Sequence, residues 1–396
     1  MSNLYSVRDA NIKGKKVLFR VDFNVPIDLV TKRISDETRL KAVLPTIQFL
    51  LKKKAKIIFV SHLGRPNGLF KQELTLAPIA SALENLLKKK VSLVNPSIGA
   101  SAKKVIDAMK PGDMVMLENI RFYHEEEKND STFSQKLASL AEIYVNDAFG
   151  AVHRAHASTV GVTSFLPSFA GFLLEKEVKA LSPLLLNPKR PFVMIIGGAK
   201  IDTKIGVLRH FIDKVDAFFI GGALANTFLK AQGYDIGASF CENAKLDVAR
   251  DIMMNVEKSN ERFILPHDVV VADNLQSSEI IDLPLEDVEG DMKIFDLGKK
   301  TISRFCVLLK TAKTVVWNGP LGCIEYPLFQ NGTRKIAETL ALSKATTILG
   351  GGDTLDALKK FSIKESSFTH VSTGGGAMLE FLEGTILPGI KVLLKK

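Results

Sequence analysis

The chain has 396 residues, of which 46% are hydrophobic and 24% are charged, and it carries a formal net charge of +10. A single hydrophobic core stops growing at roughly 250–300 residues, so this length predicts two domains, and the apolar content excludes a disordered chain. The positive charge leaves a nucleic acid, an anionic lipid and a small polyanionic substrate open as partners.

Two further features restrict the class of protein. No apolar run approaches the roughly 18 residues needed to span a bilayer, and the N-terminal residues lack the apolar core of a signal peptide. We therefore expect a cytoplasmic protein without a membrane partner. The three cysteines, Cys241, Cys306 and Cys323, are widely spaced and form no CxxC pair, which disfavours a disulfide framework and a zinc site and predicts reduced, buried thiols.

Short β-branched or aromatic runs alternate with longer amphipathic segments along the chain. Near-continuous apolar strands followed by helices are typical of parallel sheets covered on both faces, so we predict two doubly wound, Rossmann-like α/β domains. Helices are predicted between most strands, for example at 36–54 and 202–215. The predicted strands cover residues 15–23, 55–62, 113–119, 142–147, 191–199, 216–224, 262–272, 314–320, 346–352 and 369–375.

The boundary between the two domains is predicted at a helical segment in the middle of the chain. Residues 172–186 have helical spacing and precede residues 187–191, whose prolines cannot continue a helix. We therefore predict an N-terminal domain at 1–170, a hinge helix and linker at 171–191, and a second domain at 192–373.

Polar and basic side chains follow successive strands of the first half. In open α/β sheets, ligands bind beyond the carboxyl ends of the strands, so side chains at these ends converge. Because a guanidinium fork matches carboxylate and phosphate oxygens, arginines gathered without paired acids indicate a small, multiply charged anion. For the Asp-x-Asn pair, the alternative is a cap or a turn. The set comprises Asp22, Asn24, Arg39, His62, Arg65, Arg121, Arg154 and His156.

The segment VNDAFGAVHRAHAST at 145–159 raises three alternatives. A metal site would place His153 and His156 on one helical face with further ligands, and no cysteine is near. A hydrolase would need a hydroxyl oriented by a histidine in a nucleophile elbow, and the sequence has no such elbow here. We therefore interpret the segment as part of a basic rim, in which Arg154 and His156 hold an anion and His153 is structural.

The strand ends of the second half are rich in glycine instead. Glycines at strand-to-helix turns let backbone N–H groups approach a phosphate, so five such turns indicate a nucleotide, although close helix packing can also require glycine. The sequence has no GxxxxGK[ST] loop and no complete GxGxxG, which weakens the P-loop and dinucleotide alternatives. Lys200 and Lys204 are predicted to lie one helical turn apart, so that both face the phosphates, and Asp353 is placed to meet Mg²⁺.

Taken together, these motifs resemble the phosphoglycerate kinase family. The similarity covers both halves of the chain, in order, through RVDFNVP, SHLGRP, LENIRF, NDAFGAVHRAHAS, GGAK, VWNGP, GGGDT and STGGGAMLEFLEG. The resemblance implies a two-domain, monomeric enzyme that exchanges a phosphoryl group between 1,3-bisphosphoglycerate and MgADP, giving 3-phosphoglycerate and MgATP. It also implies that residues 374–396 return to the N-terminal domain and that the domains close by hinge bending.

The resemblance assigns roles to matching positions. Those on the substrate side are Asp22, Phe23, Asn24, Arg39, His62, Leu63, Gly64, Arg65, Arg121 and Arg154, with His156 in the same patch. Those on the nucleotide side are Lys200, Lys204, Gly298, Asn318, Glu325, Gly351, Gly352, Asp353 and Thr354, with Glu325 on the ribose and Asp353 on the metal. Both attacking groups of this reaction are already anionic, so no general base is needed. We expect the transferring group to be neutralised by Arg39, Lys200, Gly352 and the backbone N–H groups at 374–376, Gly375 among them.

Some positions depart from the family pattern. Ala223 stands in place of a usual glycine near the adenine pocket, and no proline follows Gly298. The loop IDLVTKRISDETR lacks the usual Asp-Gly turn, and FGAVHRAH replaces the commoner FGTAHRAH. These departures concern local loop geometry and nucleotide affinity rather than the reaction.

Two other functions compete with this one. A NAD-dependent dehydrogenase is suggested only by the α/β pattern and the glycine turns, and its fingerprint is missing. A nucleic-acid-binding module would place aromatic side chains among its basic runs as stacking platforms, and the lysine runs at 51–56 and 86–91 contain none. Lysines there are typical of solvated helix C-termini, so we expect no nucleic-acid partner.

Overall fold

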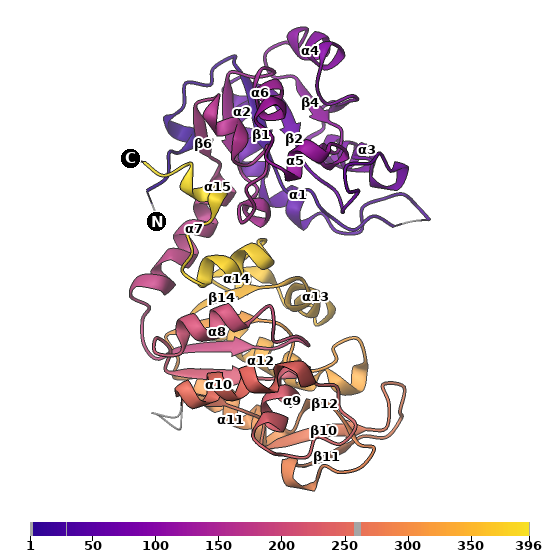
Figure 1. The fold of residues 1–396 in the computed structure, drawn as a ribbon, viewed down its shortest axis with the longest axis vertical. Coiled ribbons are helices and arrows are strands. Elements are labelled where there is room, and N and C mark those ends of the chain that lie inside the picture. Colours follow the sequence, from indigo (N-terminus) through magenta and orange to yellow (C-terminus); the bar gives the residue numbers. More distant parts are fainter. Residues whose placement is uncertain (1–2, 29, 257–262, 396) are drawn as a thin grey trace. The chain divides into compact units, whose positions relative to one another are not determined.

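The computed structural model describes residues 3–28, 30–256 and 263–395. The chain divides into two compact units, one formed by Met1–Ser182 with Ile386–Lys396 and the other by Pro183–Thr385. Strands alternate with helices in each unit (Figure 1), so the predicted α/β class is confirmed.

The division between the units falls within helix α7 (Phe172–Leu186), which has the bounds predicted for the central helix. The end of the chain divides differently from the prediction. Residues 374–385 group with the second unit, so the return expected for 374–396 begins only at Ile386.

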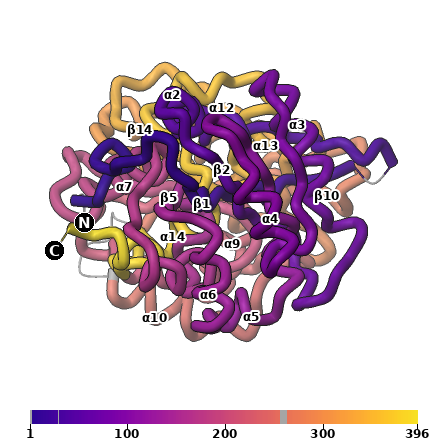
Figure 2. The backbone as a smooth tube through the Cα atoms, turned by 90° about the horizontal axis from the view of Figure 1, so that it is seen from above, coloured from indigo at the N-terminus to yellow at the C-terminus, as the bar shows by residue number. Residues whose placement is uncertain are grey.

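The two ends of the chain lie side by side in the first unit (Figures 1 and 2). Leu4 forms an antiparallel bridge with Leu394, and the Tyr5 N–H donates to the Leu393 carbonyl at 3.0 Å. These backbone contacts tie the last residues of the chain to the start of the same unit.

The first unit is built on a six-stranded parallel sheet with the order β3-β4-β2-β1-β5-β6. In the central pair, Lys16 lies opposite Lys56 and Arg20 opposite Val60, so the two strands end at the same level. The segments that follow them therefore leave one edge of the sheet together. The strands are β1 (Lys16–Arg20), β2 (Lys56–Val60), β3 (Ser92–Val94), β4 (Met114–Leu117), β5 (Ile143–Asn146) and β6 (Ser168–Ala170).

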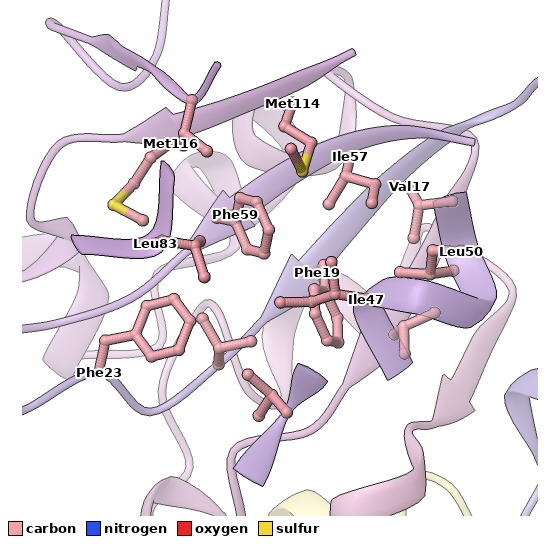
Figure 3. Close-up of a cluster of buried hydrophobic side chains, with 14 of the residues drawn as sticks. Val17, Phe19, Phe23, Ile47, Leu50, Ile57, Phe59, Leu83, Met114 and Met116 are labelled. Atoms are coloured by element: carbon pink, nitrogen blue, oxygen red, sulfur yellow. The ribbon is translucent and has the colours of Figure 1, made fainter. Parts of the chain in front are cut away.

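Apolar side chains cover both faces of this sheet. Phe19 and Phe59 pack on one face in a cluster with Ile47 and Leu50 of α2 (Figure 3). The ring centroids of the two phenylalanines are 5.8 Å apart. Side chains at the intervening strand positions, such as Leu18, belong to a second buried cluster. Burial on both faces explains why these strands read as continuous apolar runs in the sequence.

The helical segment predicted at 36–54 is two helices. Pro45 occupies the start of the second helix, and because proline has no N–H, it cannot continue the hydrogen-bond ladder of the first. The α-helices of the first unit, besides α7, are α1 (Thr38–Ala42), α2 (Leu44–Lys52), α3 (Ala77–Leu87), α4 (Ala100–Asp107), α5 (His124–Glu127), α6 (Ser131–Ala138) and α15 (Pro388–Lys391). Its 3-10 helices are η1 (Val7–Asp9), η2 (Gln72–Leu74), η3 (Ile120–Phe122), η4 (Phe149–Ala151) and η5 (Gly161–Ser164).

The second unit contains another six-stranded parallel sheet, with the order β15-β14-β13-β7-β8-β9, and a three-stranded antiparallel sheet, β11-β10-β12. The strand predicted at 262–272 is divided between the two sheets, because Pro266 lacks an N–H for the ladder; its first residue, Arg262, lies outside the described residues. The strands are β7 (Phe192–Ile196), β8 (Ala217–Ile220), β9 (Phe263–Ile264), β10 (Asp268–Ala272), β11 (Ile281–Pro284), β12 (Lys293–Leu297), β13 (Thr314–Asn318), β14 (Thr346–Gly350) and β15 (His370–Val371).

The helices of the second unit pack on the parallel sheet. Ile302 of α11, Ile336 of α12 and Leu358 of α13 share one buried cluster with Trp317 of β13. The α-helices are α8 (Ile205–Phe211), α9 (Gly222–Ala231), α10 (Leu246–Val256), α11 (Lys299–Leu309), α12 (Asn331–Ala341), α13 (Gly352–Lys360) and α14 (Gly376–Leu382). The 3-10 helices are η6 (Asn243–Lys245), η7 (Leu285–Asp287), η8 (Pro327–Phe329) and η9 (Glu365–Ser367).

Two smaller expectations need correction or restatement. The three cysteines form no disulfide, but they are half-buried rather than fully buried. Among the described helices, none is long and apolar enough to cross a membrane.

Candidate functional site

The first candidate site is a basic rim beyond the ends of β1 and β2 in the first unit. Arg39 Nη1 lies 3.0 Å from Asp22 Oδ2 and donates to the Asn24 carbonyl at 3.1 Å. The Gly64 N–H donates to Asn24 Oδ1 at 2.9 Å. Asp22 Oδ1 also accepts from the Asn24 N–H at 3.1 Å, so the turn-forming alternative and the clustering of predicted residues are both present.

Arg121 joins the loops that follow β2 and β4. Its Nη1 donates to the Gly64 carbonyl at 2.9 Å, and its Nε lies 3.3 Å from Glu127 Oε1. Gly64 has a φ of +61°, and a Cβ there would lie 2.9 Å from a methyl of Leu74, so the turn requires glycine. The predicted residues of these two loops are therefore held in one place.

The segment after β5 adds a histidine pair and a further arginine. Arg154 Nε donates to His153 Nε2 at 3.1 Å, so His153, predicted to be structural, holds the guanidinium of Arg154. Burial, followed by the charges of Arg121, Arg20 and Arg154, lowers the pKa of His156 to about 3. Near neutral pH, His156 is thus an uncharged hydrogen-bonding group rather than a cation.

Not every predicted substrate residue offers its side chain to a ligand. The side chains of Phe23 and Leu63 lie in the hydrophobic core of the first unit, so only their backbone groups are available to a ligand. The ring of His62 is mostly buried, at 5% exposure, and its Nδ1 faces Arg20, so only its Nε2 side is left for a ligand, while Arg65 is exposed. The cations of the rim are thus Arg39, Arg65, Arg121 and Arg154, a set suited to a small anion with several charges. The expectation of arginines without paired acids was wrong for two of them, because Arg39 pairs with Asp22 and Arg121 lies beside Glu127.

The second candidate site is a cavity of about 640 Å³ within the second unit. Its size is that of a typical small-molecule site, which occupies about 300–1,000 Å³. Apolar walls come from Phe240, Leu275 and Phe295, and the predicted residues Glu325 and Asp353 also line it. Ala223, the departure noted near the expected adenine pocket, lies in the lining as well.

The glycine turns of the second unit fall into two groups. At Gly197 a Cβ would lie 2.1 Å from the Pro320 carbonyl oxygen, so this glycine serves close backbone packing. At Gly352, Gly375 and Gly376 a Cβ would meet no atom within 4 Å among the described residues. Gly375 has a φ of +53°, a conformation that favours glycine. At Gly352 and Gly376 neither packing nor a positive φ requires glycine, whereas approach of a ligand to the backbone would.

The structure separates the two predicted phosphate lysines. Both precede α8, which begins at Ile205, so they are not one turn apart on a helix as predicted. Lys200 is exposed, while the buried Lys204 donates through Nζ to Asn318 Oδ1. Burial lowers the pKa of Lys204 to about 8, an effect opposed by the nearby charge of Asp353.

The remaining nucleotide-side residues support the cavity or lie away from it. Asn318 Nδ2 donates to the Gly350 carbonyl at 3.0 Å, and Thr354 Oγ1 accepts from the Gly319 N–H at 2.8 Å. Gly351 has a φ of +98° at the start of α13, a conformation that favours glycine.

Gly298 is placed at the N-terminus of α11, outside the cavity lining. There, the N–H groups of Lys300 and Thr301 already donate to the Asp268 carboxylate, at 2.7 and 2.6 Å. The first-turn donors of this helix are therefore used within the protein.

Asp353 is the residue that fits a metal ion. It is exposed in the first turn of α13 and lines the cavity. Within the described part of the chain, no group of three or more His, Cys, Asp or Glu is placed to hold a metal. A single carboxylate suits Mg²⁺, which typically completes its shell with phosphate oxygens and water.

The cavity walls are the part of the site that sequence reasoning missed. Phe240 and Leu275 come from loops, and Ile294 and Phe295 come from an antiparallel strand that was not predicted. An apolar residue in a loop carries no signal of its spatial neighbours. The only sequence signal near this wall was the departure at Ala223.

Comparison with known proteins gives the family. The family model for phosphoglycerate kinase matches residues 7–385. The chain belongs to the phosphoglycerate kinase family. A phosphoglycerate kinase of Dictyoglomus turgidum is 49% identical over 395 residues, and one of Pelotomaculum thermopropionicum is 47% identical over 392 residues; each alignment covers 99% of both chains.

Solved structures of phosphoglycerate kinases share the fold of this chain. The enzyme from Coxiella burnetii superposes with a TM-score of 0.88 at 43% identity, and that from Pyrococcus horikoshii OT3 with a TM-score of 0.87 at 31% identity; each covers 98% of both chains. The resemblance inferred from the motifs is thus confirmed. The dehydrogenase alternative finds no support in these relatives.

Proposed function

We propose that this protein catalyses reversible transfer of a phosphoryl group between 1,3-bisphosphoglycerate and ADP, giving 3-phosphoglycerate and ATP. Membership of the phosphoglycerate kinase family carries the proposal. The four arginines beyond one parallel sheet and the nucleotide-sized cavity within the other unit support it.

The basic rim of the first unit is the proposed glycerate site. The guanidinium groups of Arg39, Arg65, Arg121 and Arg154 would bind the phosphate and carboxylate oxygens. Asp22 and Asn24 hold Arg39 and the Gly64 loop in place and present their remaining polar atoms to the substrate.

The cavity of the second unit is the proposed nucleotide site. The apolar walls would take the base, Glu325 the ribose hydroxyls, and Lys204 with the open turns at Gly352 and Gly375 the phosphates. Asp353 would hold Mg²⁺, which when bound neutralises phosphate oxygens.

Charge neutralisation and positioning account for the chemistry. The attacking group is an ADP phosphate oxygen in one direction and the glycerate carboxylate in the other, so neither needs a base. Arg39, Lys200 and the N–H groups near Gly375 would stabilise the negative charge on the phosphoryl group during its transfer. Because the two reactants bind to different units, we also propose that the units close about α7 during the reaction.

We further propose that the enzyme acts as a cytoplasmic monomer without a nucleic-acid partner. Both candidate sites are built from residues of a single chain, and their chemistry is that of small phosphorylated ligands.

A coupled assay tests the proposed function. Purified protein with MgATP and 3-phosphoglycerate should form an acyl phosphate, detected by NADH oxidation through glyceraldehyde-3-phosphate dehydrogenase. Arg33→Ala, an exposed substitution in the first unit, is the matched control for Arg39→Ala and should retain activity. Absence of acyl phosphate with folded wild-type protein would refute the proposal.

A further inference from the structure

His62 is held at one ring nitrogen by a buried arginine. Arg20, the last residue of β1, is only 1% exposed, and its Nη2 lies 3.2 Å from His62 Nδ1. A guanidinium has N–H donors, no acceptor, and stays charged in proteins, so His62 Nδ1 is the acceptor. A ring nitrogen that accepts carries no proton. The single proton of the neutral ring therefore lies on Nε2, on the side of the ring away from Arg20.

The guanidinium of Arg20 is itself held by other groups. Its Nε donates to Ser158 Oγ at 2.9 Å, and its Nη1 donates to the Val21 carbonyl. Ser158 links Arg20 to Glu126. Its Oγ donates to Glu126 Oε1 at 2.5 Å, and its N–H donates to Glu126 Oε2 at 2.8 Å. Glu126 is fully buried, which raises the pKa of its carboxyl, but the charge of Arg20 and the two hydrogen bonds from Ser158 oppose this shift. They favour the carboxylate, which is the counter-charge that a buried guanidinium needs.

The charged groups around His62 oppose a second proton on its ring. Burial, together with the charges of Arg20 on β1, Arg121 on η3 and Arg39 on α1, holds the pKa of His62 well below its usual range. His156, after β5, also faces His62 but is itself uncharged near neutral pH. Glu126 on α5 is connected to His62 through Ser158 and Arg20, and its Oε1 also lies 3.8 Å from His156 Nδ1.

We propose that Arg20 is a positioning residue that holds His62 as its neutral Nε2–H tautomer, so that His62 offers the glycerate substrate a directed N–H donor. This inference rests on the proposed function, because it takes the basic rim as the substrate site. The rim then combines two kinds of group: arginines that supply charge, and a neutral imidazole that supplies one oriented N–H.

The tautomer can be read directly by ¹⁵N NMR of the imidazole nitrogens in the full-length, ligand-free protein, with His62→Gln for assignment. We expect an unprotonated Nδ1 and a protonated Nε2 at every pH from about 5.5 to 7.5, one unit on either side of the usual histidine pKa. A proton on Nδ1, or a titration within this range, would overturn the proposal. Since no substrate is used, this result is independent of the coupled assay that tests the proposed function.

A kinetic test uses Arg20→Lys, which keeps the positive charge and loses the three-way fork. We compare the KM for 3-phosphoglycerate of variant and wild type at each pH, because the ratio cancels ionisation of the substrate. The ratio should be about tenfold at pH 7.5 and shrink toward pH 5.5, where a freed His62 becomes cationic. A ratio that is the same at all pH values would show a merely structural role for Arg20 and refute the proposal.

Two companion variants keep this test interpretable. Ser158→Ala removes the acceptor of Arg20 Nε and should shift the KM ratio in the same direction by a smaller factor, even if Arg20→Lys does not fold. Arg33→Lys, an exposed substitution in the same unit, should leave the KM unchanged at every pH. An unchanged ratio in folded Ser158→Ala would contradict the proposed connection to Glu126.

Discussion

The two units are built on the same kind of six-stranded parallel sheet, but their candidate anion sites are built from different kinds of chemical group. In the first unit, charged side chains at the strand ends do the work, as in the Arg39 pair with Asp22 and the Arg121 bond to Gly64. In the second unit, the site is an apolar cavity whose lining includes glycines and the carboxyl groups of Glu325 and Asp353, with the buried Lys204 close to Asp353.

This difference follows from the ligands that the two sites suit. A small anion offers only charged oxygens, so a dense set of guanidinium forks matches it. A nucleotide has a base, a ribose and phosphates in a row. Its site therefore needs an apolar wall for the base, a carboxylate for the ribose and backbone N–H groups for the phosphates, in that spatial order. The same sheet edge thus serves both ligands through the residues placed on it.

The largest effect on activity should come from removing the positive charge of Arg39 in the first unit. Arg39→Ala removes the partner of Asp22 and should lower kcat by about 10²–10³-fold, the cost of losing one preorganised charge donor. The binding of ADP, measured by calorimetry, should stay unchanged. A loss of ADP affinity as large as the loss of kcat would contradict the assignment of the two ligands to separate units.

A second effect should appear on the other side of the comparison. Lys204→Met removes the buried ammonium and should lower kcat/KM for the nucleotide by about 10–100-fold, as expected for a charge-assisted contact to phosphate. In the wild type, burial lowers the pKa of Lys204 to about 8, so the nucleotide affinity of the free enzyme should fall as the pH rises through about 8. A flat profile between pH 7 and 9 would contradict this role.

A third effect concerns the metal. Asp353→Asn should raise the Mg²⁺ concentration needed for half-maximal activity by about tenfold, because one of the one or two carboxylates typical of a Mg²⁺ site is lost. Removal of Mg²⁺ with EDTA should abolish activity in both proteins. Asp356→Asn lies on the same helix with an exposed side chain and is the matched control. A similar response in both variants would assign the effect to general surface charge.

The smallest effect should fall outside both sites. Asp147 is buried after β5, and its Oδ1 accepts from the Leu174 N–H at 2.9 Å. Burial raises the pKa of Asp147 to about 7, so between its unfolded value near 4 and about 7 the folded state binds more protons. The wild type therefore loses stability as the pH rises through this window.

Asp147→Asn removes this dependence. The Tm of the variant minus that of the wild type should increase by a few degrees from pH 5 to pH 8. This corresponds to a change of about 1–2 kcal/mol in the relative free energy of unfolding. Asp213→Asn, an exposed change, should show no such trend. Both ligand affinities should be retained, and a difference in Tm that is constant with pH would contradict the raised pKa.

Much of the fold could be predicted because burial on both faces leaves a continuous apolar run, as in β1 and β7. The missed strands lack that signal. β3 and β6 have three residues each, and β11 is largely exposed, so it shows no apolar pattern. Single prolines also mattered: Pro45 divides one predicted helix and Pro266 one predicted strand.

The candidate sites were predictable where chain position implies spatial position. Arg39, His62 and Arg121 follow strands that share one sheet edge, so their convergence could be predicted. The counter-charge of Arg20 could not, because Glu126 is one of three consecutive glutamates and only packing shows that it is the buried one.

Each unit is proposed to carry its own half of the site, and crossed calorimetry can separate the two halves. 3-Phosphoglycerate and ADP are titrated separately into wild type, Arg154→Ala and Lys204→Met. Arg154→Ala should weaken 3-phosphoglycerate binding by about tenfold or more and leave ADP within about twofold, and Lys204→Met should do the reverse. Loss of both ligands in either folded variant would contradict the claim.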